Sequence, residues 1–323
     1  MKKILFFLLI LLFTGNSVNA ENMVQKINYL QFPLHYVGLP DFPPFSYYDT
    51  QTKKWKGAFL KPTAEALERH GVTFIPGEPS AHNFTDIKLT LIDVRSGTYE
   101  LFIGANSDTR LYKGLELIHP AVISNPIHVI TLPETQQTIK SYSDLRRLRG
   151  CISKAEYFSD FVLRKTKELN VEFVDTPFDA YKKLFTGDVD YILGSLYFNK
   201  IEASKHGIER YLSFSKNPLY KIPVFIAMSK VTPMMSEYLR TLSEEFKKPE
   251  YGTAVKQEVI RIIDEEIQRN EGIVPPSFTK EEAVIDEEKV DENENIVENI
   301  NNSGHIIKKE VETVTFDEVL DGI

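Results

Sequence analysis

The sequence predicts an α/β fold made of two lobes that are joined by two hinge strands. Each half of the chain alternates short apolar runs with segments of helical periodicity, which is typical of a mostly parallel sheet covered by helices. Two further apolar runs, His128–Pro133 and Ile222–Ser229, lie where the chain would cross between the halves. We therefore expect these two runs to pair as the hinge.

The first half predicts the order strand, helix, strand, helix, strand. Pro43 and Pro44 cannot lie inside a helix or a central strand, so the aromatic residues around them are expected on a rigid loop. Apolar residues three to four positions apart predict an amphipathic helix over Phe84–Arg95. The other expected elements are a strand at Leu34–Pro40, a helix at Leu60–Arg69, a strand at Val72–Ile75 and a buried strand through Tyr99, Leu101, Phe102 and Ile103.

The second half repeats this alternation and is followed by two helices that return to the first lobe. The expected elements are a strand at Gly150–Ser153, a helix at Tyr157–Leu169, a strand at Val171–Asp175, a helix at Pro177–Phe185, a strand at Asp190–Leu193, and the returning helices Met235–Phe246 and Gly252–Glu266. The predicted division is a signal peptide (1–20), lobe 1 (21–128), lobe 2 with the hinge strands (129–222), the returning part of lobe 1 (223–270) and a tail (271–323).

The amino terminus has the pattern of a secretory signal peptide. Lys2 and Lys3 precede the apolar run Ile4–Phe13, and small residues follow as far as Ala20, after which we expect cleavage. The apolar run is shorter than the roughly 20 residues that span a bilayer. The sequence therefore predicts a periplasmic protein, and Cys151, its only cysteine, is expected to be a small buried apolar residue rather than a nucleophile.

Negative charge is concentrated in the tail. Fourteen acidic and four basic residues between Lys280 and Ile323 contribute −10 to a total of −8, which leaves +2 for residues 1–279. A nearly neutral body argues against nucleic acid as a partner, because phosphate binding needs a strongly basic face. The tail has few aromatic residues and is expected to be disordered, either without a specific role or as a docking segment.

Arg110 follows the buried strand of the first half by a few small and polar residues. Ligand sites in open α/β sheets lie just beyond the carboxyl ends of such strands, and a guanidinium group suits a carboxylate. The alternative is a surface arginine in a loop.

Four motifs in order resemble the bacterial family 3 extracellular solute-binding proteins, which are the amino-acid-type periplasmic binding proteins of ABC transporters. The motifs are FPPFSYYDTQTKKWKGAF, NFTDIKLTLIDVRSGTYELFIGA, SDTR and FTGDVDYILGS, and the similarity runs from Leu34 to Ile263. The resemblance implies a type 2 periplasmic-binding-protein fold that closes on a small anionic or zwitterionic ligand. It also implies an ABC permease in the inner membrane as partner, no cofactor and a monomeric state.

The resemblance also implies roles for individual residues. Arg110 matches the arginine that holds the ligand carboxylate, and Asn106 and Ser107 belong to the motif that leads to it. Phe42 and Phe84 match aromatic residues that flank the ligand, although both residue types also serve ordinary lobe packing. Ser153 begins the SKAEY stretch, which corresponds to a turn that donates hydrogen bonds to the carboxylate.

Ser195 departs from the family pattern. It stands where amino-acid binders have an aspartate that takes the ligand's ammonium group, and a serine holds an ammonium group less well. Glu156 and Asp41 are candidate substitutes. An organic acid, a peptide fragment or another small anion would fit Arg110 and Lys154 as well as an amino acid does.

Two other functional classes remain open. A cyclohexadienyl dehydratase uses the same scaffold, and Glu156 is the best-placed acid for such chemistry, although a solvated glutamate at a helix start is the expectation for it. The sequence has no Gly-x-Ser-x-Gly elbow, and its histidines lack metal-ligand spacing. The third class is a sensory or interaction protein that uses the acidic tail.

Overall fold

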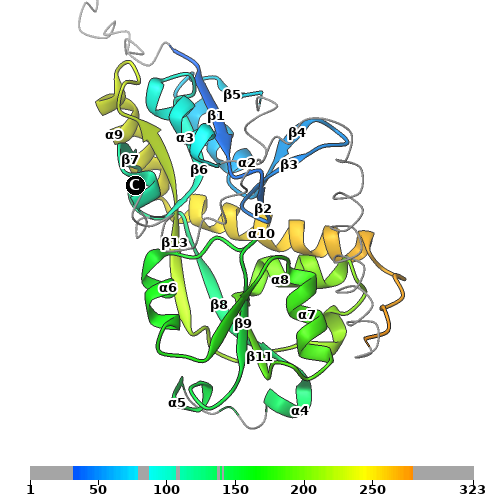
Figure 1. Ribbon diagram of the computed structural model, residues 1–323. Coiled ribbons are helices and arrows are strands. Elements are labelled where there is room, and N and C mark those ends of the chain that lie inside the picture. Colours follow the sequence, from blue (N-terminus) through cyan, green and yellow to red (C-terminus); the bar gives the residue numbers. More distant parts are fainter. Residues whose placement is uncertain (1–31, 79–86, 107–109, 137–138, 140–141, 279–323) are drawn as a thin grey trace, which may run out of the picture.

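The computed structural model describes residues 32–78, 87–106, 110–136, 139 and 142–278 (Figure 1). The expected signal peptide, Phe84, Ser107 and the acidic segment from Thr279 onward lie outside these residues. In the described part of the chain, no helix is both long and apolar enough to cross a membrane.

A ten-stranded sheet runs through both lobes. Its central path is β10-β9-β11-β8-β13-β6-β1-β5, with β12 beside β8 and β7 beside β13. The strands are β1 (Leu34–Gly38), β5 (Phe74–Pro76), β6 (Leu101–Asn106), β7 (Leu115–Leu117), β8 (Ile123–Thr131), β9 (Gly150–Ser153), β10 (Val171–Val174), β11 (Tyr191–Ser195), β12 (Ser213–Phe214) and β13 (Tyr220–Ser229). A separate small sheet has the order β2-β3-β4, formed by β2 (Asp41–Phe42), β3 (Ser46–Asp49) and β4 (Lys54–Lys56).

The two hinge strands form the middle of the large sheet. β8 and β13 pair in antiparallel fashion, with Tyr220 opposite Ile127 and Val224 opposite Ile123. On one side, β13 pairs with β6 of lobe 1, and on the other side β8 pairs with β11 of lobe 2. The predicted fold class is therefore confirmed: two α/β lobes are joined by two hinge strands (Figure 1). The expected pairing of the run His128–Pro133 with Ile222–Ser229 is wrong, because β13 pairs with the earlier part of β8, and His128 to Ile130 pair with β11.

The predicted burial of the strand before Arg110 is also confirmed. All six residues of β6 are buried, because it lies between β1 and β13 inside the sheet. Tyr99 does not belong to this strand. Its hydroxyl donates a hydrogen bond to the backbone oxygen of Glu78 at 2.7 Å, before the strand begins at Leu101.

Helices cover the sheet in both lobes. They are α2 (Leu60–Glu68), α3 (Ile87–Ser96), α4 (Pro133–Gln136), α5 (Tyr142–Leu145), α6 (Asp160–Thr166), α7 (Pro177–Phe185), α8 (Leu196–Ser204), α9 (Met235–Phe246) and α10 (Pro249–Arg269), with 3₁₀ turns η1 (Arg110–Tyr112) and η2 (Glu209–Tyr211). α7 begins and ends as predicted, because Thr176 and Asp179 form a capping box at its start. α9 also has its predicted bounds.

The helix expected at Tyr157–Leu169 is shorter, and this difference matters for the site. α6 begins at Asp160 because the side chain of Ser159 caps it, accepting a hydrogen bond from the backbone nitrogen of Val162 at 3.4 Å. Tyr157 and Phe158 are thereby left on the turn that precedes the helix. The prediction that placed both residues inside a helix is wrong.

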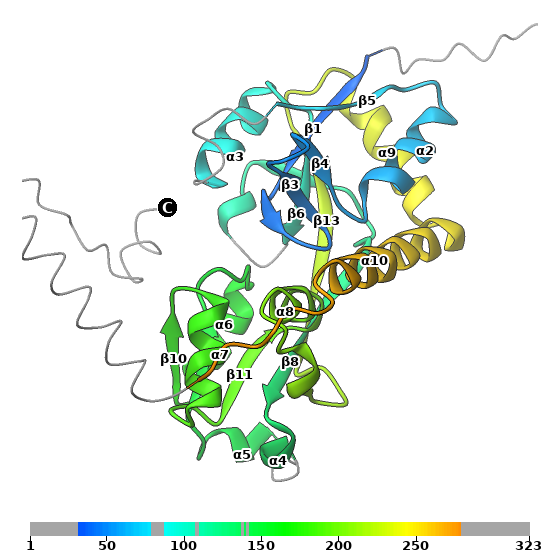
Figure 2. The same ribbon diagram turned by 90° about the vertical axis from the view of Figure 1, so that its right-hand side faces the viewer.

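α10 is longer than the expected Gly252–Glu266 and lies across both lobes (Figure 2). It packs on α2 and α9 of lobe 1 and on α8 of lobe 2. The chain beyond it continues over lobe 2. The side-chain amide of Asn270 donates a hydrogen bond to the hydroxyl of Ser204 at 2.9 Å, and the ring of Phe278 stacks on that of Phe185 with centroids 4.5 Å apart. Phe278, which was expected to belong to the tail, thus packs against lobe 2 in the structure.

Each lobe has its own hydrophobic core. The core of lobe 1 contains Phe45, Phe59, Phe102 and Tyr238, all of them without exposed surface. Cys151 lies in the core of lobe 2 and is fully buried, which confirms its predicted structural role. Its burial raises the pKa of the thiol to about 12, so the thiolate needed for nucleophilic chemistry is not formed near neutral pH.

Candidate functional site

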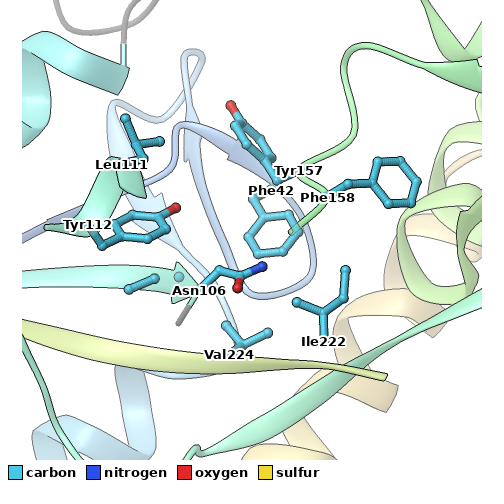
Figure 3. Close-up of a pocket in the computed structure, with 10 residues that line it drawn as sticks. Phe42, Asn106, Leu111, Tyr112, Tyr157, Phe158, Ile222 and Val224 are labelled. Atoms are coloured by element: carbon cyan, nitrogen blue, oxygen red, sulfur yellow. The ribbon is translucent and has the colours of Figure 1, made fainter. Parts of the chain in front are cut away.

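A small cavity lies between the two lobes, at the hinge. Its volume is about 50 Å³, which is room for a few water molecules. Lobe 1, the hinge strand β13 and lobe 2 all contribute to its wall, which consists of Phe42, Gly104, Ala105, Asn106, Leu111, Tyr112, Tyr157, Phe158, Ile222 and Val224 (Figure 3). The wall is mainly aromatic and aliphatic.

Two aromatic contacts join the lobes beside this cavity. The ring of Phe42 in lobe 1 meets that of Tyr157 in lobe 2 edge-to-face, with centroids 5.3 Å apart. Phe45 meets Tyr197 of α8 in the same manner at 5.8 Å. Such pairs contribute about 0.5–1.5 kcal/mol each beyond the area that they bury. The two lobes therefore touch through these rings beside the hinge.

Phe42 and Asn106, two of the predicted site residues, are brought together at this cavity. Asn106 is the last residue of β6 and is only 8% exposed, and in Figure 3 its amide lies between the Phe42 ring and Val224. Gly104 allows the Phe42 ring to lie close to β6. It has a φ of +97°, and a β-carbon there would lie 3.3 Å from the Phe42 ring.

Arg110 begins the 3₁₀ turn η1, and the two residues after it, Leu111 and Tyr112, line the cavity. The backbone of the predicted motif therefore reaches the site, whereas the side chain of Arg110 lies outside the described part of the structure. Tyr112 was not predicted as a site residue. Its hydroxyl points toward the cavity in Figure 3, and burial, together with nearby Tyr157, raises its pKa.

Ser153 and Ser195 do not line the cavity but face the interior of lobe 2. The Ser195 hydroxyl donates to Oδ1 of Asn125 at 2.6 Å and accepts from the backbone nitrogen of Phe198, which caps α8. The Ser153 hydroxyl accepts a hydrogen bond from the backbone nitrogen of Ala155 at 3.2 Å. Both serines are at most 2% exposed. Their side chains serve the local structure of lobe 2.

Glu156 is buried, so the expectation of a solvated glutamate at a helix start is wrong. Its Oε2 accepts a hydrogen bond from the backbone nitrogen of Ser195 at 2.6 Å, and its Oε1 accepts one from Nδ2 of Asn199 at 2.8 Å. Burial raises the pKa of Glu156 to about 8; the two hydrogen bonds oppose this shift, and the nearby carboxylate of Glu202 adds to it. The acid missing at position 195 thus lies next to that position, inside lobe 2.

The other charged candidates lie on the surface. Asp41 is exposed at the start of β2, next to Phe42. It is close enough to Tyr157 to add to the effect of burial, which raises the pKa of that tyrosine to about 12. Lys154 is paired with Asp175 at 2.8 Å rather than directed at the cavity lining. Within the residues that the structure describes, no cluster of three or more His, Cys, Asp or Glu side chains is placed to hold a metal ion.

Sequence reasoning missed the aromatic wall contributed by Tyr112, Tyr157 and Phe158. A signal was present in each case, because Leu111 and Tyr112 directly follow the predicted arginine, Tyr157 ends the SKAEY stretch and Phe158 directly follows it. The helical periodicity expected from Tyr157 onward concealed the second pair.

No family model and no curated protein matches the chain. Solved structures do match its fold. A protein from Wolinella succinogenes DSM 1740, assigned as the binding component of an ABC transporter and complexed with lysine, has a TM-score of 0.55 at 17% identity; the match covers 72% of this chain and 95% of that one. The GluR0 ligand-binding core in complex with L-glutamate has a TM-score of 0.52 at 13% identity, with 72% and 97% covered.

An ancestral amino-acid-binding protein, AncCDT-1, described as a precursor of cyclohexadienyl dehydratase, has a TM-score of 0.50 at 13% identity, with 72% of this chain and 95% of that chain covered. At such low sequence identities, the structural similarity shows the fold but not which ligand is bound. The chain has the fold of the type 2 periplasmic binding proteins.

Proposed function

We propose that the protein is a periplasmic solute-binding protein of the amino-acid-binding type, which captures a small carboxylate-bearing ligand by closing its two lobes. The observation that supports this proposal most directly is the cavity at the hinge, whose wall combines residues of lobe 1, lobe 2 and β13. A ligand held there would contact both lobes and would stabilise the closed form by its differential affinity.

The wall of the cavity favours a ligand with an apolar body. Phe42, Tyr157 and Val224 offer apolar surface, and Asn106 offers an amide at the same place. We assign the ligand carboxylate to Arg110 on the sequence motif. The solved neighbours bind lysine and glutamate, and both carry an α-carboxylate.

A transport role in the periplasm fits the amino-terminal pattern of a signal peptide. In that role, the closed form would be presented to an ABC permease in the inner membrane. A permease and an ATPase encoded beside this protein would favour transport.

The decisive experiment is a thermal-shift screen of amino acids, organic acids and small peptides against the mature protein. We expect a stabilising compound whose effect disappears in Arg110→Ala. Arg240→Ala is a suitable control, because Arg240 is exposed on α9 and pairs only with Glu244 among the described residues. A compound that stabilises Arg110→Ala as strongly as the unaltered protein would refute the assignment of Arg110.

An enzyme is the second candidate, for two reasons. AncCDT-1 is described as a precursor of cyclohexadienyl dehydratase, and Glu156 has the raised pKa of many catalytic acids. Glu156 does not line the cavity, however, and both of its oxygens are bonded inside lobe 2. Turnover of prephenate-like compounds would establish the enzyme, whereas stabilisation by an unchanged compound would favour the binder. A receptor role, as in the GluR0 core, would require a membrane partner instead of a permease.

A further inference from the structure

Tyr112 is held in a fixed position at the edge of the cavity. It is the last residue of η1, and its ring packs on that of Phe102 in the buried strand β6, with centroids 5.6 Å apart. The guanidinium group of Arg95 on α3 donates hydrogen bonds to the backbone oxygens of the two flanking residues, Leu111 at 2.6 Å and Lys113 at 3.2 Å. Lobe 1 therefore sets both the backbone and the ring of this tyrosine.

The hydroxyl of Tyr112 reaches the cavity without a partner from the protein. The residue is only 7% exposed, and its oxygen points toward the cavity in Figure 3. None of the residues that the structure describes forms a hydrogen bond with this hydroxyl. A buried hydroxyl that lacks a hydrogen bond costs about 1–3 kcal/mol. A ligand that displaces water from this place therefore has to offer the hydroxyl a hydrogen bond in return.

The surroundings of this hydroxyl favour an oxygen as its partner rather than an ammonium group. The described wall of the cavity is mainly aromatic and aliphatic, the amide of Asn106 is polar but uncharged, and none of these lining residues is acidic. Burial, together with nearby Tyr157, raises the pKa of Tyr112, so the hydroxyl stays protonated at neutral pH and is able to donate. A neutral hydroxyl offers no charge to balance an ammonium group, but it forms an ordinary hydrogen bond with a carbonyl or hydroxyl oxygen.

We propose that Tyr112 is a specificity-determining residue whose hydroxyl donates a hydrogen bond to an uncharged oxygen of the ligand, and that the ligand belongs to the 2-oxo or 2-hydroxy carboxylic acids. Arg110, to which the proposed function assigns the carboxylate, begins the same short turn that Tyr112 ends. Such acids carry the carboxylate and the uncharged oxygen on neighbouring carbon atoms. Their apolar remainder would lie against Phe42 and Val224. The inference deepens the proposed function and rests on it, because it takes the cavity between the lobes as the ligand site.

The test compares acids that differ only in this oxygen. Phenylpyruvate is paired with 3-phenylpropanoate, and 4-methyl-2-oxopentanoate with 4-methylpentanoate, because the second acid of each pair has a methylene group in place of the oxo group. Calorimetric titration measures the dissociation constants of all four acids for the unaltered mature protein, Tyr112→Phe and Tyr36→Phe. Tyr36 is a matched control, since it is also 7% exposed in lobe 1 but stacks on Phe74 and does not line the cavity.

We expect the unaltered protein and Tyr36→Phe to bind each oxo acid about tenfold tighter than its partner, which corresponds to one hydrogen bond between neutral groups. In Tyr112→Phe this ratio should fall to about 1, because the oxo acid loses affinity while its partner does not. A general disturbance of the cavity would instead weaken both acids of a pair and preserve their ratio. A preserved ratio in Tyr112→Phe would therefore overturn the inference.

The outcomes also separate this inference from the proposed function. If the unaltered protein binds both acids of each pair equally tightly, the role of Tyr112 is refuted, whereas binding that depends on Arg110 would still support a carboxylate-binding protein. This result requires no variant at position 112 to fold. If none of the four acids binds, the inferred ligand class is wrong, and the wider thermal-shift screen then decides the proposed function by itself.

Discussion

The carboxylate of Glu156 accepts a hydrogen bond from the backbone nitrogen of Ser195 at 2.6 Å. Position 195 is where the family resemblance leads us to expect an acid, and the structure places a carboxyl group from the neighbouring turn beside it. That carboxyl group occupies the space left by Gly194 and accepts a hydrogen bond from the side-chain amide of Asn199. The pair therefore represents a rearrangement of the lobe-2 polar groups, in which a residue expected to bind the ligand supports the protein instead.

Restoring the family's aspartate should destabilise this protein. Ser195→Asp would place a second carboxylate next to Glu156 and would remove the hydrogen bond to Asn125. Two buried carboxylates without a cation oppose each other, so we expect a loss on the order of 3 kcal/mol in the free energy of unfolding at pH 9, above the raised pKa of Glu156. Ser195→Ala, which removes only the cap and the bond to Asn125, should cost about 1 kcal/mol. Chemical denaturation measures both values.

The double variant Ser195→Asp with Glu156→Gln provides the control for this prediction. If repulsion between the carboxylates is the cause, the second substitution should recover most of the lost stability. A double variant no more stable than Ser195→Asp alone would assign the loss to packing.

Contact between Phe42 and Tyr157 should contribute to closure but little to the stability of either lobe. The two rings come from different lobes and meet with centroids 5.3 Å apart. A double-mutant cycle with Phe42→Leu and Tyr157→Leu should give a coupling of about 0.5–1.5 kcal/mol in the closed protein. A coupling of zero would show that the rings do not touch in solution. Tyr48→Leu with Tyr157→Leu is a control, because Tyr48 packs on Trp55 within lobe 1.

Stability in acid should depend on Glu245. Burial alone would raise its pKa, but hydrogen bonds from Lys248, Arg69 and His70 outweigh burial and hold the pKa at about 2, below the ordinary value of 4.5. A group whose pKa is lower in the folded state stabilises the protein above its unfolded value and loses that contribution as the pH falls. The contribution, up to about 3 kcal/mol, should therefore disappear between pH 4.5 and 2.

Glu245→Gln tests the direction of this pH dependence. The variant should be less stable than the unaltered protein at pH 7, and the difference in unfolding free energy should shrink steadily below pH 4.5. Glu244→Gln, an exposed neighbour paired only with Arg240 in the described structure, should show little difference at any pH. A difference for Glu245→Gln that does not change with pH would contradict the assignment.

The end of the folded body should lie at Phe278. Its ring stacks on Phe185 at 4.5 Å and lies near Phe178 at 5.9 Å. A chain that ends after Phe278 should melt within about 1 °C of the full mature chain, whereas one that ends after Gly272 should lose about 1–3 kcal/mol from the exposed rings. Scanning calorimetry distinguishes the two. A large drop for the chain that ends after Phe278 would show that residues 279–323 pack on the body.

The fold was predictable because its signals are local and repeated. The helices expected at Pro177–Phe185 and Met235–Phe246 have their observed bounds as α7 and α9, and the apolar run Leu101–Ile103 predicted the burial of β6. The site was predictable only in part. Phe42 and Asn106 follow from motifs, but the orientation of Ser195 depends on Asn125, which is 70 residues away in the chain. The burial of Glu156 depends on Gly194 in the same way, and no local pattern encodes such distant contacts.

The ligand's amino group should matter less here than in an amino-acid binder. Ser195 and Glu156 are bonded to each other inside lobe 2, and no acidic side chain lines the described wall of the cavity. Without a carboxylate partner, an ammonium group loses the roughly 1.5–3 kcal/mol of a charged hydrogen bond, or about 10- to 100-fold in affinity. We therefore expect phenylpyruvate to bind at least as tightly as phenylalanine, and 4-methyl-2-oxopentanoate as tightly as leucine. Calorimetric titration of each pair, with Arg110→Ala as the control for carboxylate binding, measures the difference. Amino acids that bind more than tenfold tighter than their oxo counterparts would show that another acid of the chain holds the ammonium group.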